Sequence, residues 1–456
     1  MPEGVEHRYI PNTDADCQAM LQAIGLASIA DLFRGIPKDL RLTRPLAVPK
    51  ALSEQEMLRH MRMLGSRNAN VEDYAAFLGA GAYHHFIPSI VPALISRGEF
   101  MTAYTPYQPE MAQGTLQAIY EYQTLISQLT DLEVANASLY DGASGLAEGV
   151  LMARRITRRE EVLISEAVHP EYRAVLRTYL QNLGTQVYEV KVDETGQTPL
   201  RRVEGGLSKQ TACVVVQSPN FFGVVEDLTG FAAAAHERGA LLVQAVAEPV
   251  SLGLLKPPGA WGADIALGEG HGFGNPLSYG GPYLGFFATR EEYVRQMPGR
   301  LAGETVDSEG RRGYVLTLAT REQHIRREKA TSNICTNEGL CALAATVYLC
   351  ALGKVGLRKL AQLNLQRAIY ARHQLAAIPG CRVAFTGPTF NEFVLEMPKP
   401  AREIITKLTE QRLIAGVDLG RFYPQRSHAL LMCVTEMNPR EDIDRLCEAL
   451  STAVRA

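Results

Sequence analysis

The sequence predicts an α/β protein, with a mainly parallel sheet covered by helices on both faces and a smaller α+β domain at the C-terminal end. Between about residues 134 and 290, short apolar segments alternate with helical segments. Several of these apolar segments are continuous, as in strands that are buried on both faces. Beyond about residue 380, strand-like segments alternate with two further helices, which predicts the smaller domain.

Length and composition allow a large buried core. The chain has 456 residues, 46% of them hydrophobic, which is enough for two or three domains. We expect an N-terminal helical arm over residues 1–65, a large α/β domain over 66–330 and a small C-terminal domain over 331–456.

Charge and targeting signals exclude several classes of protein. A net charge of -3 argues against a nucleic-acid-binding protein, which usually carries a basic face. No apolar run reaches the roughly 18 residues needed to span a membrane, and the N-terminus lacks the pattern of a secretory signal. The eight cysteines contain no Cys-x-x-Cys pair, which indicates reduced, mostly buried thiols and no zinc site. We expect a cytoplasmic protein that binds no metal, membrane or nucleic acid.

The N-terminal part is expected to be helical and open. In "ALSEQEMLRHMRMLGSRN", Ser53 is a candidate N-cap with Glu56 three residues later, the pattern of a capping box. The segment over residues 77–114 is rich in Gly, Pro, Tyr and His, and it is too irregular for one helix. Residues 115–133 then show the apolar spacing of a helix.

The remaining elements follow from the same patterns. The strands expected in the large domain are 161–170, 185–193, 211–220, 240–249 and 264–269, with 283–289 as an antiparallel addition. Helices are expected at 142–156, 171–184, 227–239 and 338–375. The small domain is expected to contain strands at 381–387, 391–397 and 428–437 and helices at 401–414 and 438–450.

Polar residues stand where predicted strands end, which is where ligands bind in open α/β sheets. "SLYDGASGLAEG" places a Gly/Ser turn at a helix start, where backbone N–H groups can bind an anion, although tight turns without a ligand are more common. His169 is equally consistent with a ring that stacks on a planar cofactor and with a turn histidine. Ser218 and Asn220 could contact a ligand or only end a strand.

Two further segments have alternative interpretations. Residues 299–337 are polar and contain six arginines, which favours a surface or a subunit interface over a lid or an anion-contacting loop. "YTPYQPEMAQG" is dense in Tyr, Pro and Gln, so it could shape a pocket or only pack beneath a neighbouring element.

The motifs "YTPYQPEMAQG", "SLYDGASGLAEG", "QSPNFFG", "YGGPYLGFFATR", "MPGRLAGETVD" and "REQHIRREKATSNICTN" occur in this order. Together they resemble the P-protein of the glycine cleavage system, and within it the alpha subunit (subunit 1) of the two-chain form. The resemblance covers nearly the whole chain.

The resemblance implies a pyridoxal-phosphate-dependent fold of the aspartate-aminotransferase type (fold type I). In the complete enzyme, glycine binds to pyridoxal phosphate, carbon dioxide leaves, and the aminomethyl group passes to the lipoyl arm of the H-protein. It also implies a partner, the beta subunit (subunit 2), which binds the cofactor, and assembly into a heterotetramer.

The family places the cofactor lysine of the beta subunit in "His-Lys-Thr", shortly before "Gly-Gly-Pro". The equivalent position here is His271 or Gly272, and neither can form a Schiff base. The acid expected near the pyridine nitrogen is also missing, because Gln244 carries no charge and Glu248 lies further along. The resemblance therefore implies that this chain contains no catalytic or cofactor-binding residue.

What the resemblance leaves to this chain is a contribution to the partner's active site. The candidate residues are Tyr104, Thr105, Gln108, Ser332, Asn333 and Thr336. Two alternatives stay open: a non-enzymatic scaffold subunit, and a self-sufficient pyridoxal-phosphate enzyme that uses Lys256 or Lys329.

Overall fold

The computed structural model describes residue 9 and residues 11–455. Its contacts divide the chain into two units, Met1–Asn68 and Ala69–Ala456, which are described separately. The three domains expected from the sequence remain a prediction.

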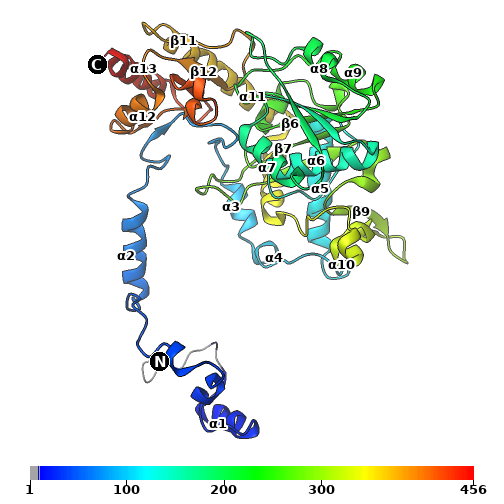
Figure 1. Cartoon of the computed structure of the whole chain (residues 1–456), viewed down its shortest axis with the longest axis vertical. Coiled ribbons are helices and arrows are strands. Elements are labelled where there is room, and N and C mark those ends of the chain that lie inside the picture. The colour runs from blue at the N-terminus through cyan, green and yellow to red at the C-terminus, as the bar shows by residue number, and fades with distance from the viewer. Residues whose placement is uncertain (1–8, 10, 456) are drawn as a thin grey trace. The chain divides into compact units, whose positions relative to one another are not determined.

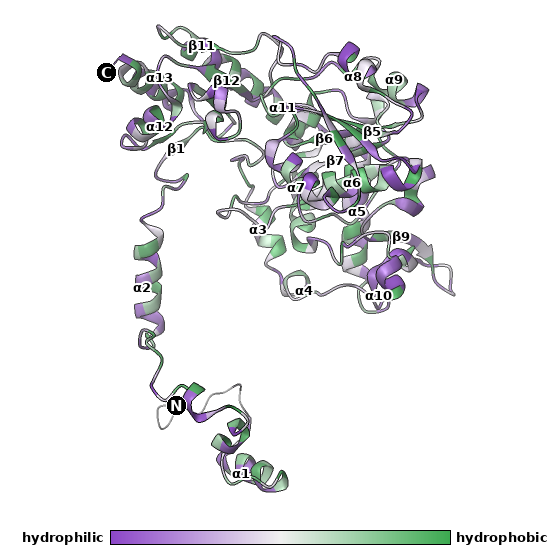
Figure 2. Cartoon of the chain, viewed as in Figure 1, coloured by the Kyte–Doolittle hydropathy of each residue, from purple (hydrophilic) through white to green (hydrophobic). Residues whose placement is uncertain are grey.

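The first unit contains α1 (Asp14–Ala23), α2 (Glu54–Gly65) and the 3-10 helices η1 (Ile29–Phe33) and η2 (Lys38–Leu40). The expected capping box is confirmed, since Ser53 and Glu56 cap α2 reciprocally. Figure 2 shows hydrophobic and hydrophilic residues interleaved along α2. Among the described residues of this unit, Leu21 is the only buried hydrophobic side chain, so the unit has no core of its own.

The second unit is built on a seven-stranded sheet of order β2-β8-β7-β6-β5-β3-β4 (Figure 1). Its parallel strands are β3 (Glu161–Ser165), β4 (Gln186–Val190), β5 (Thr211–Gln217), β6 (Leu241–Val246) and β7 (Ile265–Glu269). Strands β8 (Gly285–Thr289) and β2 (Val134–Ala135) extend the sheet as antiparallel strands. The mainly parallel sheet and its antiparallel addition are confirmed.

Helices cover both faces of this sheet. In β6, Val243 and Ala245 pack into one cluster with residues of α6 (Gly142–Thr157) and α7 (Pro170–Leu180). Leu242 packs into another cluster, with residues of α8 (Leu200–Gly206) and α9 (Phe231–Glu237). Alternate residues of one strand therefore serve two cores, which explains why the strands are apolar throughout.

Further helices precede and follow the sheet. They are α3 (Ile90–Ile95), α4 (Gly98–Met101), α5 (Gln113–Thr130) and α11 (Gly339–Ala376), with 3-10 helices η3 (Pro249–Gly253), η4 (Gly259–Trp261) and η5 (Glu291–Gln296).

Helix α11 is long and apolar enough to cross a membrane, by length and composition alone, although the sequence was expected to contain no such segment. In the structure it breaks at Gly353 and contacts α3, α5 and α13. Tyr348 and Ala361 are buried, so α11 is a core helix.

A hairpin follows that the sequence did not predict. Strands β9 (Leu301–Val306) and β10 (Arg312–Thr317) pair antiparallel within the segment expected to be a polar surface or loop. Three short helices, η6 (Ala319–Arg321), α10 (Gln323–Arg326) and η7 (Arg327–Lys329), lead from it toward α11.

The C-terminal sheet has the order β11-β12-β15-β14 and is antiparallel. Its strands are β11 (Arg382–Val383), β12 (Glu392–Glu396), β14 (Val417–Asp418) and β15 (Ala429–Cys433), and it is accompanied by α12 (Ala401–Thr409), α13 (Arg440–Arg455), η8 (Leu419–Arg421) and η9 (Pro424–Arg426). Figure 1 shows α12 and α13 beside β12.

The helix expected over 401–414 was too long. It ends at Thr409, and β13 (Leu413–Ile414) pairs in parallel with β1 (Ala75–Ala76), far away in the sequence.

The expectation that most of the eight cysteines are buried was also wrong. Three of them are buried, Cys213, Cys381 and Cys433.

Candidate functional site

The loop after β7 contains the position at which the resemblance would place a lysine. A Cβ atom built on Gly272 would lie 3.2 Å from Cγ of Pro249 and 3.3 Å from Cδ2 of His85. Both neighbours are buried. The Cβ atom of a lysine at position 272 would therefore lie in tight contact with two packed side chains.

His271 is fully buried beside this position. Its Nε2 lies 3.1 Å from the backbone nitrogen of Tyr83 and 3.2 Å from the Tyr83 carbonyl oxygen. Its ring stacks on Tyr283, with the centroids 4.7 Å apart. Burial lowers the pKa of His271 to about 4, so the imidazole is neutral at physiological pH. The ring is packed on all sides, and its Nδ1 is buried without a hydrogen-bond partner among the described residues.

Glu269, the last residue of β7, lies at the N-terminus of α6. Its Oε2 accepts a hydrogen bond from the backbone N–H of Gly142 at 3.1 Å, and its Oε1 accepts from the N–H groups of Leu284 and His271 at 3.0 and 3.2 Å. Burial raises the pKa of this carboxyl to about 8. Glu269 was not among the residues expected at the site, although a carboxyl group at the end of a buried strand is a signal of this kind.

The turn before α6 has little room for an anion. The Asp141 carboxylate accepts from the N–H of Ser144 at 2.7 Å, so it caps the helix. A Cβ atom on Gly142 would lie 2.2 Å from the hydroxyl of Tyr172. The N–H groups of Gly142 and Ser144 thus donate to carboxyl groups of this chain and are not free for a phosphate group.

A buried group, which we call the His85 triad, joins His85, Glu248 and Glu436. The His85 ring nitrogens lie 3.1 Å from Glu248 and 2.9 Å from Glu436. Burial alone would lower the pKa of His85, but the two carboxylates raise it to about 10. Burial alone would raise the pKa of Glu436, but the contacts with His85 lower it to about 2. The imidazole is therefore charged and paired on both sides.

Two amide groups complete the His85 triad. Asn391 Nδ2 donates to Glu248 at 2.7 Å, and Asn364 Nδ2 donates to Glu436 at 2.9 Å. His85 and Glu436 are 351 residues apart, so local sequence patterns could not reveal the pair. Glu248, which the sequence analysis considered too distant to meet a cofactor nitrogen, faces His85 instead.

These residues do not fit pyridoxal phosphate. At the expected lysine position the β7 loop offers a tightly packed glycine and a neutral histidine, and the amides of Gly142 and Ser144 at the start of α6 are already hydrogen-bonded. Gln244 is buried and has no charge to offer a pyridine nitrogen.

The other polar residues at strand ends have structural partners. His169 caps α7, since its Nδ1 accepts from the N–H of Glu171 at 3.2 Å, and its ring stacks on Tyr172. Ser218 Oγ accepts from the N–H of Glu226, and the Asn220 side chain donates to the carboxylate of the same residue. The interpretation as strand-ending and turn residues accounts for these contacts.

The two alternative lysines precede β7 and follow β10 in the chain. Lys256 is exposed, and its Nζ lies 3.7 Å from the ring centroid of Trp261, a cation–π contact. Lys329 ends η7 and is also exposed.

The expected interface residues lie on two loops that meet. We call residues 102–112 the Tyr104 loop and residues 330–338 the Thr336 loop. Both loops line one cavity of about 220 Å³, to which they contribute Tyr104, Thr105, Thr336 and Asn337. The Tyr104 side chain is 87% exposed, so it is available to another molecule.

The remaining candidates lie on the same loops. Gln108 lines a neighbouring depression together with Tyr104. Ser332 Oγ accepts from the N–H of Ile334, and Asn333 Oδ1 accepts from the side chain of Gln323 at 3.0 Å. The structure thus gathers Tyr104, Thr105 and Thr336 around one cavity, and the role of all six candidates remains a prediction.

No cluster of three His, Cys, Asp or Glu side chains suited to a metal ion was found among the described residues.

Comparisons with known proteins place the chain in a family. The family model of the glycine cleavage system P-protein matches residues 7–450. A probable glycine dehydrogenase (decarboxylating) subunit 1 from Desulfitobacterium hafniense is 53% identical over 438 residues, covering 96% of this chain and 98% of the relative. A relative of the same name from Moorella thermoacetica is 51% identical over 442 residues, covering 97% and 98%.

Solved structures agree. An inhibitor-bound crystal structure of glycine decarboxylase (P-protein) of the glycine cleavage system matches with a TM-score of 0.90 and 47% identity, over 98% of this chain and 100% of that chain. A sphingosine-1-phosphate lyase from Burkholderia pseudomallei shares the fold at 17% identity, with a TM-score of 0.65 over 92% and 94% of the two chains. The expected fold type I is confirmed. This chain belongs to the glycine cleavage system P-protein family.

Proposed function

We propose that this chain is the alpha subunit of a two-chain decarboxylating glycine dehydrogenase. The complex releases carbon dioxide from glycine and transfers the aminomethyl group to the lipoyl arm of an H-protein. The partner, the beta subunit, binds pyridoxal phosphate and supplies the Schiff-base lysine. The name "subunit 1" of the relatives supports a two-chain enzyme.

The β7 loop carries this proposal. Gly272 has no amine and is tightly packed against Pro249 and His85, and Gln244 offers no charge to a pyridine nitrogen, so the chain lacks two groups that the cofactor needs. The Tyr104 loop, by contrast, is largely exposed, and the Thr336 loop is mostly half-buried with Asn333, Cys335 and Thr336 exposed. We infer that these loops contribute to an active site whose cofactor lies in the partner, in a cytoplasmic heterotetramer.

Reconstitution tests the proposal. Exchange of labelled carbon dioxide into the carboxyl group of glycine is measured with H-protein and with this chain alone, the partner alone, or both. We expect exchange only in the mixture. Full exchange by the partner alone would instead favour the scaffold alternative, and exchange by this chain alone would favour a self-sufficient enzyme.

A further inference from the structure

Arg300 lies immediately before β9 and is almost fully buried, with 4% of its surface exposed. A guanidinium group has five N–H donors in a fixed plane. The structure gives it five hydrogen bonds, with acceptors in Glu322, Thr105, Tyr107, Thr336 and Cys335. Burial of a charge on this scale requires such complete pairing.

Four of these bonds reach the two loops. Nη1 donates to the hydroxyl groups of Thr105 at 3.1 Å and Thr336 at 3.0 Å. Nη2 donates to the hydroxyl group of Tyr107 and to the carbonyl oxygen of Cys335, each at 2.9 Å. One rigid group thus joins the Tyr104 loop to the Thr336 loop.

The fifth bond fixes the orientation of the guanidinium group. Nε donates to Glu322 Oε2 at 3.1 Å, and the Glu322 side chain is buried as well. The side chain of Arg321, next to Glu322 in the chain, does not join the two loops. It donates to the backbone carbonyl groups of Leu318, Met297 and Gly299.

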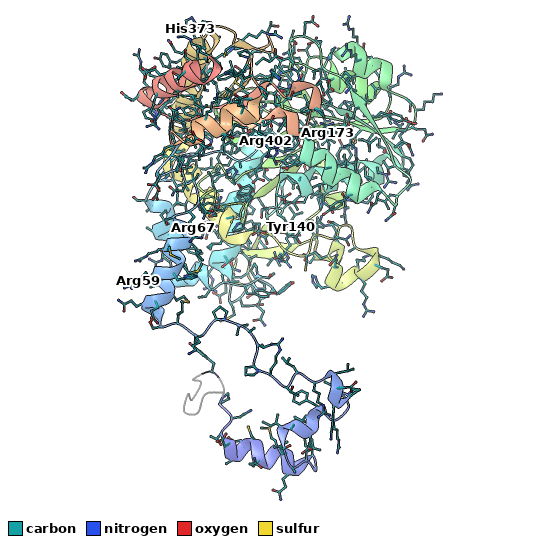
Figure 3. The ribbon with its side chains drawn as sticks, turned by 60° about the vertical axis from the view of Figure 1, so that its left-hand side comes forward. Arg59, Arg67, Tyr140, Arg173, His373 and Arg402 are labelled. Carbon is teal, nitrogen blue, oxygen red and sulfur yellow. The ribbon has the colours of Figure 1, made fainter. Side chains whose placement is uncertain are left out.

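Among the described residues, the hydrogen bonds of the Tyr104 loop with distant side chains are those with Arg300. The Thr336 loop has further bonds with residues 137–140, including one from the N–H of Glu338 to Ser138 Oγ at 3.1 Å. Tyr140, labelled in Figure 3, accepts a hydrogen bond from the N–H of Cys335 at 2.9 Å, and Asn337 donates to the carbonyl oxygen of Ala137. The contacts of Arg300 with Thr105 and Thr336 involve residues that line the 220 Å³ cavity.

We propose that Arg300 is a positioning residue, which holds the Tyr104 and Thr336 loops in the arrangement that the partner's active site requires. This inference rests on the proposed function. A lysine cannot replace Arg300, because its single ammonium group has three donors at one point and cannot reach both loops and Glu322 together.

The test compares Arg300→Lys with Arg173→Lys in the reconstituted complex. Arg173, labelled in Figure 3, is a suitable control because it is a buried residue of α7 that bonds to Glu189 and Tyr423 and to no residue of the two loops. Carbon dioxide exchange is measured at saturating glycine and saturating alpha subunit, together with the affinity of the two subunits and the Tm of each variant.

We expect Arg300→Lys to lower kcat by about tenfold or more, while Arg173→Lys changes kcat by less than about twofold at a similar loss of Tm. The double variant Thr105→Val, Thr336→Val provides a second test, because it keeps the ion pair with Glu322 and removes both hydroxyl acceptors. It should lower kcat as well.

Equal kcat values for Arg300→Lys and Arg173→Lys would overturn the inference, and so would a wild-type kcat in the double threonine variant. If the wild-type chain has no effect on the partner's activity, the proposed function fails instead. The two failures are therefore distinguishable.

Discussion

The carboxyl group of Glu269 and the imidazole of His271 explain how this chain closes the position that a cofactor would need. The Glu269 carboxyl group accepts from the N–H of Gly142 at the start of α6, and the His271 ring stacks on Tyr283. The absence of a lysine could be read from the sequence. The groups that fill the space could not, because Tyr83 and His271 are 188 residues apart and their contact depends on the fold.

Introducing a lysine should therefore not create a cofactor site. We expect Gly272→Lys to lower Tm and to give no internal-aldimine absorption when pyridoxal phosphate is added, because the new side chain meets Pro249 and His85. Gly205→Lys is the control, since a Cβ atom on Gly205 has no neighbour within 4 Å. An absorption band that borohydride removes, found only with Gly272→Lys, would contradict this account of the loop.

The His85 triad predicts a dependence of stability on pH. The pKa of His85 is raised from 6.5 to about 10 in the folded chain, so its stabilising effect is complete below about pH 6.5 and is lost as the pH rises through about 10. We expect His85→Gln to lower the free energy of unfolding by about 3–5 kcal/mol near pH 6, because two buried carboxylates lose their partner.

Urea unfolding of the wild-type chain and of His85→Gln at several pH values measures the difference between their free energies of unfolding. The effects of distant titrating groups are common to both proteins and cancel in this difference. The gap between wild type and His85→Gln should shrink as the pH approaches 10. A gap that is constant, or that grows with pH, would show that His85 is not held as a cation.

Among the secondary-structure elements, the strands that are buried on both faces of the sheet were predicted correctly from the sequence. Strands β5 and β6 are buried along their whole length, so their continuous apolar residues marked them clearly. The β9–β10 hairpin was missed because it is polar and half exposed. Strand β13 was merged into a helix because its two residues extend an amphipathic pattern, and its pairing with β1 depends on a distant segment.

The β13 assignment leads to a prediction for one residue. Leu413 is fully buried and belongs to the C-terminal core, so Leu413→Ala should lower the free energy of unfolding by about 2–5 kcal/mol. The exposed Gln411→Ala, in the turn before β13, should change it by less than about 0.5 kcal/mol. Chemical denaturation measures both, and similar small effects would mean that β13 does not anchor this core.

At the scale of the whole molecule, the chain retains the architecture of a cofactor enzyme while the centre of the expected site is filled by its own side chains. The fold class followed from strand and helix patterns, and the family followed from ordered motifs. The contacts of Arg300 and the His85 triad did not, because each joins segments that are far apart in the sequence. The exposure of Tyr104 is the observation behind the proposed contact of its loop with a partner.

In the proposed function, the Schiff-base lysine lies in the partner subunit. The most direct measurement is borohydride reduction of the active reconstituted complex with pyridoxal phosphate, followed by mass spectrometry of both chains. We predict a reduced pyridoxyl group on a lysine of the partner and none on this chain. A pyridoxyl group on Lys256 or Lys329, in proportion to activity, would contradict the account.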